Sequence, residues 1–195
     1  MAIGGVFVSS STSGAGRCWV GACVLHEGRT LGSTVVSGDA DAPYVPGHLA
    51  LREGPLLERA VRELDAAFDV LLVNATGRDH PRGAGLALHL GAALDVPTIG
   101  VTDRALVADP EGEPDEERGS SVRLVLDGKV VGLVVRTKAR ARPVMVHGGW
   151  RTDPHGARSV VLAAGGTART PEPIRRARHL ARLARAVAEA KLREG

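Results

Sequence analysis

Three consecutive segments in the middle of the chain constrain its fold more than any other feature. Residues 69–73 form a short apolar run, residues 83–93 are rich in small residues, and residues 97–101 form a second short run of strand type. The first run shows no alternation of polar and apolar residues, which is typical of a strand covered on both faces. A helix between two such strands predicts a parallel βαβ unit, and therefore a sheet with helices packed on its faces.

The segments before this unit predict three antiparallel strands and a helix. Residues 3–9 are a β-branched apolar run, and residues 18–26 and 29–37 flank Glu27-Gly28, a hairpin signal. Residues 48–67 have apolar side chains at helical spacing, and Pro55 either kinks that helix or marks its start. An antiparallel three-strand meander, a helix and then parallel βαβ strands predict an α/β fold with a ribonuclease H-like mixed sheet flanked by helices.

The remaining chain completes this fold as one domain. Residues 122–126 and 130–136 flank Asp127-Gly128, a strong signal for a two-residue hairpin turn. Residues 143–146 predict another strand, and residues 154–164 and 171–193 predict two helices. A chain of 195 residues fits the usual size of a single domain, so we expect residues 1–195 to form one unit.

Charge is distributed unevenly along the chain. The segment 109–118 carries six carboxylates against one arginine, a local charge of −5, so the remainder carries 3 − (−5) = +8. A basic body suits a polyanion-binding surface, although a solvated surface of an arginine-rich protein has the same composition. The long aperiodic segment 102–120 indicates mobility or an ordering partner. Residues 109–118 are accordingly a candidate docking loop for a protein partner.

The predicted terminal helix carries a stripe of arginines. Its members recur at steps of three and four residues or their multiples: Arg175, Arg178, Arg182, Arg185 and Arg193. Such a stripe either follows a nucleic-acid backbone or forms a solvated face opposite the core.

Several gapless sequence blocks, in the same order along the chain, resemble those of endonuclease V. They are Pro43-Tyr44-Val45-Pro46-Gly47, residues 51–55, Gly77-Arg78-Asp79-His80-Pro81-Arg82, and residues 96–101, 134–138 and 171–175. The resemblance implies a magnesium-dependent hydrolase that acts in DNA repair and cuts the second phosphodiester 3′ to inosine in DNA or RNA. Magnesium prefers oxygen ligands, so such chemistry needs two or three carboxylates at adjacent strand ends.

Positions that the resemblance assigns to the catalytic centre are substituted in this chain. Phe7 and Asn74 stand where metal-binding aspartates are expected, and Asp103 stands at an expected lysine. Trp150 stands at an expected histidine, whereas Glu53 is retained. A benzyl ring cannot bind a hard cation, and an amide oxygen brings no negative charge. These replacements predict a catalytically impaired or inactive relative, in effect a pseudoenzyme.

A rebuilt catalytic centre is one alternative. Glu53 and Asp103, together with Asn74 or His80, could meet at the carboxyl edge of the sheet and hold magnesium. In the opposing interpretation, Asp103 caps the turn after a strand or pairs with Arg104 or another surface arginine. His80 either orients a water or a phosphate, or stabilises the turn in which it lies.

The resemblance also implies a surface that contacts the damaged base. Tyr44, with Pro46 and Gly47 in the same loop, is the residue expected to wedge beside that base. Arg82, at the start of the next helix, is expected to contact a phosphate.

Two of the chain's few aromatic residues have competing interpretations. Phe7 and Trp150 either form a platform on which bases stack, or fill and cover a space that lacks its metal.

We therefore expect a nucleic-acid-binding protein, with two alternatives: an active metal-dependent endonuclease, and a protein-interaction module. No apolar run reaches membrane-spanning length, and we expect a cytoplasmic protein. Cys18 and Cys23 are five residues apart on one predicted strand, which places them on opposite faces and disfavours a disulfide between them.

Overall fold

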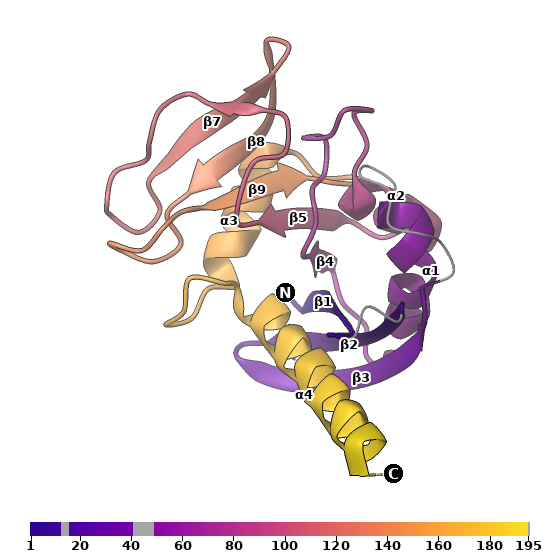
Figure 1. Cartoon of the computed structure of the whole chain (residues 1–195). Coiled ribbons are helices and arrows are strands. Elements are labelled where there is room, and N and C mark those ends of the chain that lie inside the picture. The colour runs from indigo at the N-terminus through magenta and orange to yellow at the C-terminus, as the bar shows by residue number, and fades with distance from the viewer. Residues whose placement is uncertain (13–15, 41–48, 195) are drawn as a thin grey trace.

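A mixed sheet forms the centre of the protein in the computed structural model, which describes residues 1–12, 16–40 and 49–194. Strands β1 (Ile3–Ser10), β2 (Arg17–His26) and β3 (Arg29–Asp39) form the antiparallel meander. Strand β4 (Val70–Val73) lies parallel to β1, and β5 (Thr98–Thr102) lies parallel to β4. This arrangement confirms the predicted ribonuclease H-like sheet (Figure 1).

Four further strands extend the sheet beyond β5. Strand β9 (Val144–Gly148) pairs antiparallel with β5 and with β8 (Lys129–Val135), which pairs with β7 (Ser121–Leu126). At the edge, β6 (Asp109–Pro110) pairs with β7. In the described part of the chain the strand order is β3-β2-β1-β4-β5-β9-β8-β7-β6. The short β6 lies within the segment that the sequence predicts to be a loop without regular structure.

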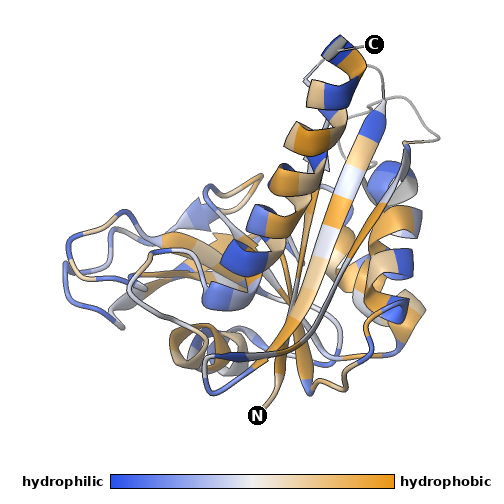
Figure 2. Ribbon diagram, turned by 90° about the horizontal axis from the view of Figure 1, so that it is seen from below, coloured by the Kyte–Doolittle hydropathy of each residue, from blue (hydrophilic) through white to orange (hydrophobic). Residues whose placement is uncertain are grey.

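Helices cover both faces of the sheet. Helices α1 (Leu49–Arg62) and α2 (Leu86–Leu94) contribute to one hydrophobic core, which contains Val20, Leu57 and Leu90. Helices α3 (Pro154–Ala163) and α4 (Glu172–Glu194) contribute to a second core on the other face, which contains Leu72, Val161 and Ile174. Figure 2 shows hydrophilic segments recurring along α4 up to the C-terminus.

Helix α1 is shorter than predicted. It ends at Arg62, five residues before the predicted end, and Pro55 lies inside it instead of starting it. The amide groups of Glu63 and Leu64 still bond to the carbonyls of Arg59 and Val61, so the chain leaves the helix through one further turn.

Two glycines allow α4 to lie directly on the sheet. A Cβ atom built on Gly5 would lie 2.3 Å from the carbonyl carbon of Pro173, and one on Gly21 would lie 2.3 Å from the carbonyl oxygen of Ala177. Because Gly5 and Gly21 place no side chain at these two contacts, α4 lies close to β1 and β2, and its next turn lies above Phe7.

The remaining sequence-level expectations concern the cysteines and the membrane. Cys18 and Cys23 are both buried and free, as expected. Among the helices in the described part of the chain, none is long and apolar enough to cross a membrane.

Candidate nucleic-acid interface

Three of the four substituted positions lie toward the carboxyl side of the neighbouring parallel strands β1, β4 and β5. Val6 of β1 is the partner of Val73 of β4, so the next residues, Phe7 and Asn74, lie side by side. Asp103 directly follows β5, the strand next to β4. The sequence assigned Phe7, Asn74 and Asp103 to this region through the family resemblance, and expected Asp103 to meet Glu53 and either Asn74 or His80 at the carboxyl edge of the sheet.

Two arginines of α4 lie over the ring of Phe7, a residue in the second half of β1. The guanidinium carbon of Arg178 lies 4.9 Å from the centroid of the Phe7 ring, and that of Arg182 lies 5.8 Å from it. Arg178 also donates a hydrogen bond of 3.5 Å to the side-chain oxygen of Asn74. The Phe7 ring itself packs partly buried against the core. The surface at the substituted positions is therefore made of guanidinium groups stacked on an aromatic ring.

A third arginine binds the carboxylate at this edge. The guanidinium of Arg169 forms an ion pair with Asp103 and donates a hydrogen bond of 3.1 Å to the carbonyl oxygen of Pro143. Asp103 thus pairs with an arginine that lies 66 residues further along the chain. We call Phe7, Asn74, Asp103, Arg169, Arg178 and Arg182 the arginine cluster.

The arginine cluster carries an excess of positive charge. Desolvation lowers the pKa of Arg178, and the positive charges of Arg182 and Arg169 lower it further. The carboxylate of Asp103 acts in the opposite direction and raises it. The Nε atom of Arg178 is buried and has no hydrogen-bond partner. A guanidinium remains charged through any ordinary shift of its pKa. The cluster therefore holds three cations and one carboxylate.

Glu53, the retained carboxylate, lies in α1, on the opposite face of the sheet from α4. Its side chain is buried, with a residue exposure of 7%. Burial raises the pKa of Glu53, and the neighbouring guanidinium of Arg52 lowers it. Burial thus favours the neutral acid, whereas a metal ligand must be ionised.

The turn after β4 is organised by an aspartate that sequence reasoning did not single out. Asp79 is fully buried, and its carboxylate accepts hydrogen bonds of 2.7–2.8 Å from the backbone amides of Leu106, Val107 and Ala108. Its signal in the sequence was only its place before His80-Pro81 in a βα turn. Asp79 therefore holds the segment after β5, which begins with Asp103.

His80 and Arg82 lie in the same turn as Asp79. The Nδ1 atom of His80 accepts a hydrogen bond of 3.2 Å from the backbone amide of Arg82. This contact has the geometry expected of a turn-stabilising histidine. The Arg82 side chain is exposed, and its contact with a phosphate stays a prediction.

Comparison with known proteins identifies the family. Residues 1–179 match the family model described as Endonuclease V. Among curated relatives, the endonuclease V of Methanopyrus kandleri is 49% identical over 78% of this chain and 65% of its own length. That of Rhodospirillum centenum is 46% identical over 73% of this chain and 59% of its own length. The chain belongs to the endonuclease V family.

Solved structures of endonuclease V have the same fold. The protein from Streptomyces avermitilis superposes with a TM-score of 0.89 at 34% identity, covering 98% of this chain and 83% of its own. The Bacillus subtilis protein gives a TM-score of 0.91 at 25% identity, covering 97% and 83% of the two chains. The Ciona intestinalis protein, crystallised with inosine-containing DNA, gives 0.77 at 22% identity, covering 93% and 84%.

Phe7, Asn74 and Asp103 do not form a binding site for the divalent cation that the resemblance to endonuclease V implies. Phe7 offers no donor atom, the oxygen of Asn74 accepts from Arg178, and Asp103 is paired with Arg169. Within residues 1–12, 16–40 and 49–194, no three His, Cys, Asp or Glu side chains form a group able to hold a metal ion. Three guanidiniums would also repel a divalent cation.

Trp150 does not reach the arginine cluster, so its predicted role as a platform or cover at that edge is wrong. Its backbone amide donates to the side-chain oxygen of Thr98, and its carbonyl accepts from the Thr98 amide. Thr98 starts β5, whereas Asp103 follows its end, about 16 Å further along at roughly 3.3 Å per residue. The antiparallel pairing of β9 with β5 directs the chain away from this edge, which a sequence block cannot reveal.

The predicted base-contacting loop of this endonuclease V relative lies outside the described residues. Tyr44, Pro46 and Gly47 all belong to residues 41–48, so their assignment to substrate binding stays a prediction.

The acidic segment is ordered by the protein's own sheet. Glu111 forms an ion pair of 2.5 Å with Arg123 of β7. Arg136 is 6% exposed and donates hydrogen bonds to the carbonyl oxygens of Pro114, Asp115 and Ala141. These contacts account for its order without a partner, and a protein partner for residues 109–118 stays a prediction.

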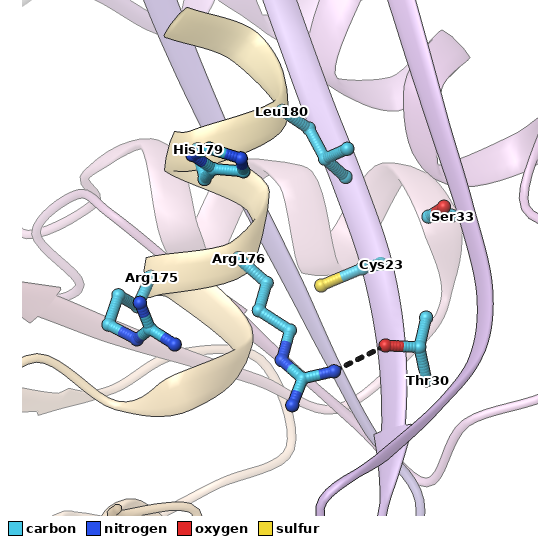
Figure 3. A pocket seen from close by; sticks show the side chains of 7 residues that line it. All are labelled: Cys23, Thr30, Ser33, Arg175, Arg176, His179 and Leu180. Carbon is cyan, nitrogen blue, oxygen red and sulfur yellow. Dashed lines mark hydrogen bonds between the residues drawn. The ribbon is translucent and has the colours of Figure 1, made fainter. Parts of the chain in front are cut away.

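A surface pocket of about 180 Å³ lies on the other side of α4, away from the arginine cluster. It is lined by Cys23, Thr30, Ser33, Arg175, Arg176, His179 and Leu180 (Figure 3). Arg176 donates hydrogen bonds to Thr30, to the carbonyl oxygen of Gly28 and to Glu172, and Arg175 donates two to Glu172. Burial raises the pKa of Cys23 to about 11, so its thiol is protonated at neutral pH.

Proposed function

We propose that this protein binds nucleic acid that contains deaminated adenine and does not hydrolyse it by metal-assisted chemistry. The observation that carries the proposal is the arginine cluster, in which guanidinium groups lie where oxygen ligands for a metal would be needed. The chain spans 65% and 59% of the length of the two curated relatives, so its activity is inferred from its own residues.

Family membership supports the nucleic-acid ligand. The Ciona intestinalis endonuclease V was crystallised with a 24mer DNA containing an inosine followed by a ribo-adenosine. The formal charge of +3 and the arginines of α4 favour a polyanion in this chain as well. We expect phosphate contacts to supply most of the affinity, whether the strand is DNA or RNA.

The donor set supports the loss of catalysis. Metal-assisted hydrolysis needs a cation that positions the attacking water and stabilises the leaving oxygen. Of the positions expected to bind the metal, only Glu53 retains a carboxylate, and burial raises its pKa. Removing one electrostatic stabiliser of a transition state typically costs about 100- to 1,000-fold in rate, and here several groups are replaced at once.

A single-turnover nicking assay tests this proposal. A labelled strand with one inosine is incubated with an excess of the protein, first with magnesium and then with manganese. We expect no cut at the second phosphodiester 3′ to inosine, together with salt-sensitive binding of the same strand.

The Glu53→Gln variant is the matched control for contaminating nuclease. Cutting that Glu53→Gln abolishes would overturn the proposal in favour of an active endonuclease with a rebuilt metal centre. Absence of both cutting and binding would favour the protein-interaction alternative.

A further inference from the structure

The arginine cluster differs from an ordinary group of surface arginines because its charges are not balanced. Asp103 is its one carboxylate and is already paired with Arg169. Arg178 has an amide and an aromatic ring as partners, and Arg182 has the same ring. In the described part of the chain, neither Arg178 nor Arg182 forms an ion pair, whereas Arg175, Arg176 and Arg185 on the same helix each do.

Holding these charges together has an electrostatic cost. Desolvation and the guanidiniums of Arg182 and Arg169 all act against the charged form of Arg178. Its Nε–H group is buried without an acceptor. An anion placed against the cluster would relieve the repulsion and accept hydrogen bonds from the outer nitrogen atoms of Arg178 and Arg182.

The backbone beneath the cluster holds the two guanidiniums in place. Contact between Gly21 and Ala177 sets the turn of α4 that carries Arg178 against the sheet. Arg178 and Arg182 are four residues apart, so they project from the same face of the helix. The ring of Phe7 supports both guanidiniums, and a ring that supports a guanidinium through its face takes up none of the N–H groups at the edge.

From these observations we infer that the guanidinium groups of Arg178 and Arg182 bind a backbone phosphate of nucleic acid directly. They take the place of a divalent cation, so the protein holds its ligand without any metal. A planar guanidinium matches two phosphate oxygens and carries its charge at every physiological pH. This inference rests on the proposed nucleic-acid binding and adds the residues and the metal independence of the contact.

The test measures binding of a fluorescently labelled single-stranded DNA with one deoxyinosine by the full chain, with EDTA and then with magnesium. We expect the two Kd values to agree within about twofold, apart from the general screening by added salt. Arg178→Gln should raise Kd by about tenfold and lower the slope of log K against log salt by about 0.7, the value for one phosphate contact on a single strand.

The Arg193→Gln variant is the matched control, because it removes the same charge from an exposed position of the same helix. Arg193 lies 15 residues from Arg178, about 22 Å along the helix. Its Kd should change less than twofold. Arg182→Gln is a second test variant with an exposed side chain, and it should weaken binding severalfold without any effect on folding.

The outcomes separate this inference from the proposed function. Binding that requires magnesium would overturn it, and so would equal effects of the Arg178, Arg182 and Arg193 variants, although nucleic-acid binding would stand in both cases. Failure of the unmodified chain to bind DNA or the equivalent inosine-containing RNA would overturn the proposed function itself. Thermal unfolding of each variant checks that a loss of binding is not a loss of fold.

Discussion

Arg176 and Arg178 lie two residues apart on one helix, yet their surroundings differ completely. Arg176 bonds to a carboxylate, a hydroxyl and a backbone carbonyl, those of Glu172, Thr30 and Gly28. Arg178 lies on an aromatic ring beside an amide and close to two other guanidiniums. An arginine whose charge and donors are satisfied within the protein stabilises the fold, whereas one without a carboxylate partner is available to a ligand.

The same comparison separates the two sides of α4. On the pocket side, Glu172 accepts from Arg175 and Arg176, so the charge beside Cys23 is partly neutralised. In the arginine cluster, the single carboxylate, that of Asp103, forms its ion pair with Arg169. We therefore assign the phosphate contact to the arginine cluster, although the pocket also contains arginines.

Charge reversal at Arg178 and at Arg176 should produce the largest difference in affinity for nucleic acid. Arg178→Glu places a carboxylate in the predicted path of the phosphate, so we expect affinity for the inosine-containing strand to fall by about 100-fold, roughly 2.7 kcal/mol. Arg176→Glu should change affinity less than threefold. Fluorescence anisotropy at fixed salt measures both values.

Thermal unfolding provides the reciprocal measurement for these variants. Arg176→Glu should lose about 1 kcal/mol of stability, because it breaks the bonds to Glu172, Thr30 and Gly28. Comparable losses of affinity in the two variants would show that the distinction between the two sides of α4 is wrong.

Asn74→Asp should give Arg178 a carboxylate partner within the protein. The substitution keeps the shape of the side chain and turns the 3.5 Å contact with Arg178 into an ion pair. We expect about fivefold weaker binding of nucleic acid and a gain of up to about 1 kcal/mol in stability, the range for exposed ion pairs. Titration with the labelled strand and a chemical unfolding curve measure the two effects.

A magnesium-dependent increase in affinity of Asn74→Asp would contradict this account. It would mean that the new carboxylate binds a cation and that Arg178 moves aside for it. Asp95→Asn, which changes an exposed charge at the end of α2, is the matched control and should leave binding unchanged.

The smallest predicted effect is the pH dependence of stability that comes from Glu172, on the pocket side of α4. Hydrogen bonds from Arg175 lower the pKa of Glu172, and a hydrogen bond from Arg176 lowers it further. Burial acts in the opposite direction and raises it. Because the folded-state pKa lies below the ordinary value of 4.5, the stability contribution is full above that value and is lost as the pH falls through the lowered pKa.

Glu172→Gln should therefore unfold with a weaker pH dependence than the unmodified chain below about pH 4.5, by no more than about 1 kcal/mol. Unfolding curves at several pH values measure this difference. At neutral pH, DNA binding by this variant should stay within twofold of the unmodified chain. If Glu172→Gln loses as much stability in acid as the unmodified chain, Glu172 is not a source of the acid sensitivity.

A second group contributes to acid sensitivity in both proteins of that experiment. Burial lowers the pKa of His147 to about 4, and nearby Asp79 opposes the shift. Its contribution to stability is full above the ordinary value of 6.5 and declines as the pH falls toward about 4. Comparison of Glu172→Gln with the unmodified chain cancels this term, since His147 is unchanged in both.

Much of the fold could be predicted from the sequence because its signals are local. The Glu27-Gly28 and Asp127-Gly128 turns join strands where expected, and the apolar run at residues 70–73 lies fully inside the sheet. The end of α1 and the short β6 were not predicted, since they depend on where packing stops and where an edge strand finds a partner.

The candidate site was predicted only in part. Phe7, Asn74 and Asp103 follow from strand order and from the family blocks. Arg169, Arg178 and Arg182 were not assigned to this edge, although the four-residue step from Arg178 to Arg182 was visible in the stripe. Trp150 was assigned to it and lies at the other end of β5.

The sequence by itself determined the order of strands and helices, the family, and the absence of the expected carboxylates at Phe7 and Asn74. Only the tertiary structure decided what faces those positions. Gly5 and Gly21 allow α4 to approach the sheet, and that approach, across more than 150 residues of chain, brings Arg178 onto Phe7. Local sequence patterns specify backbone conformation and burial, whereas contacts between distant segments depend on how the folded elements pack.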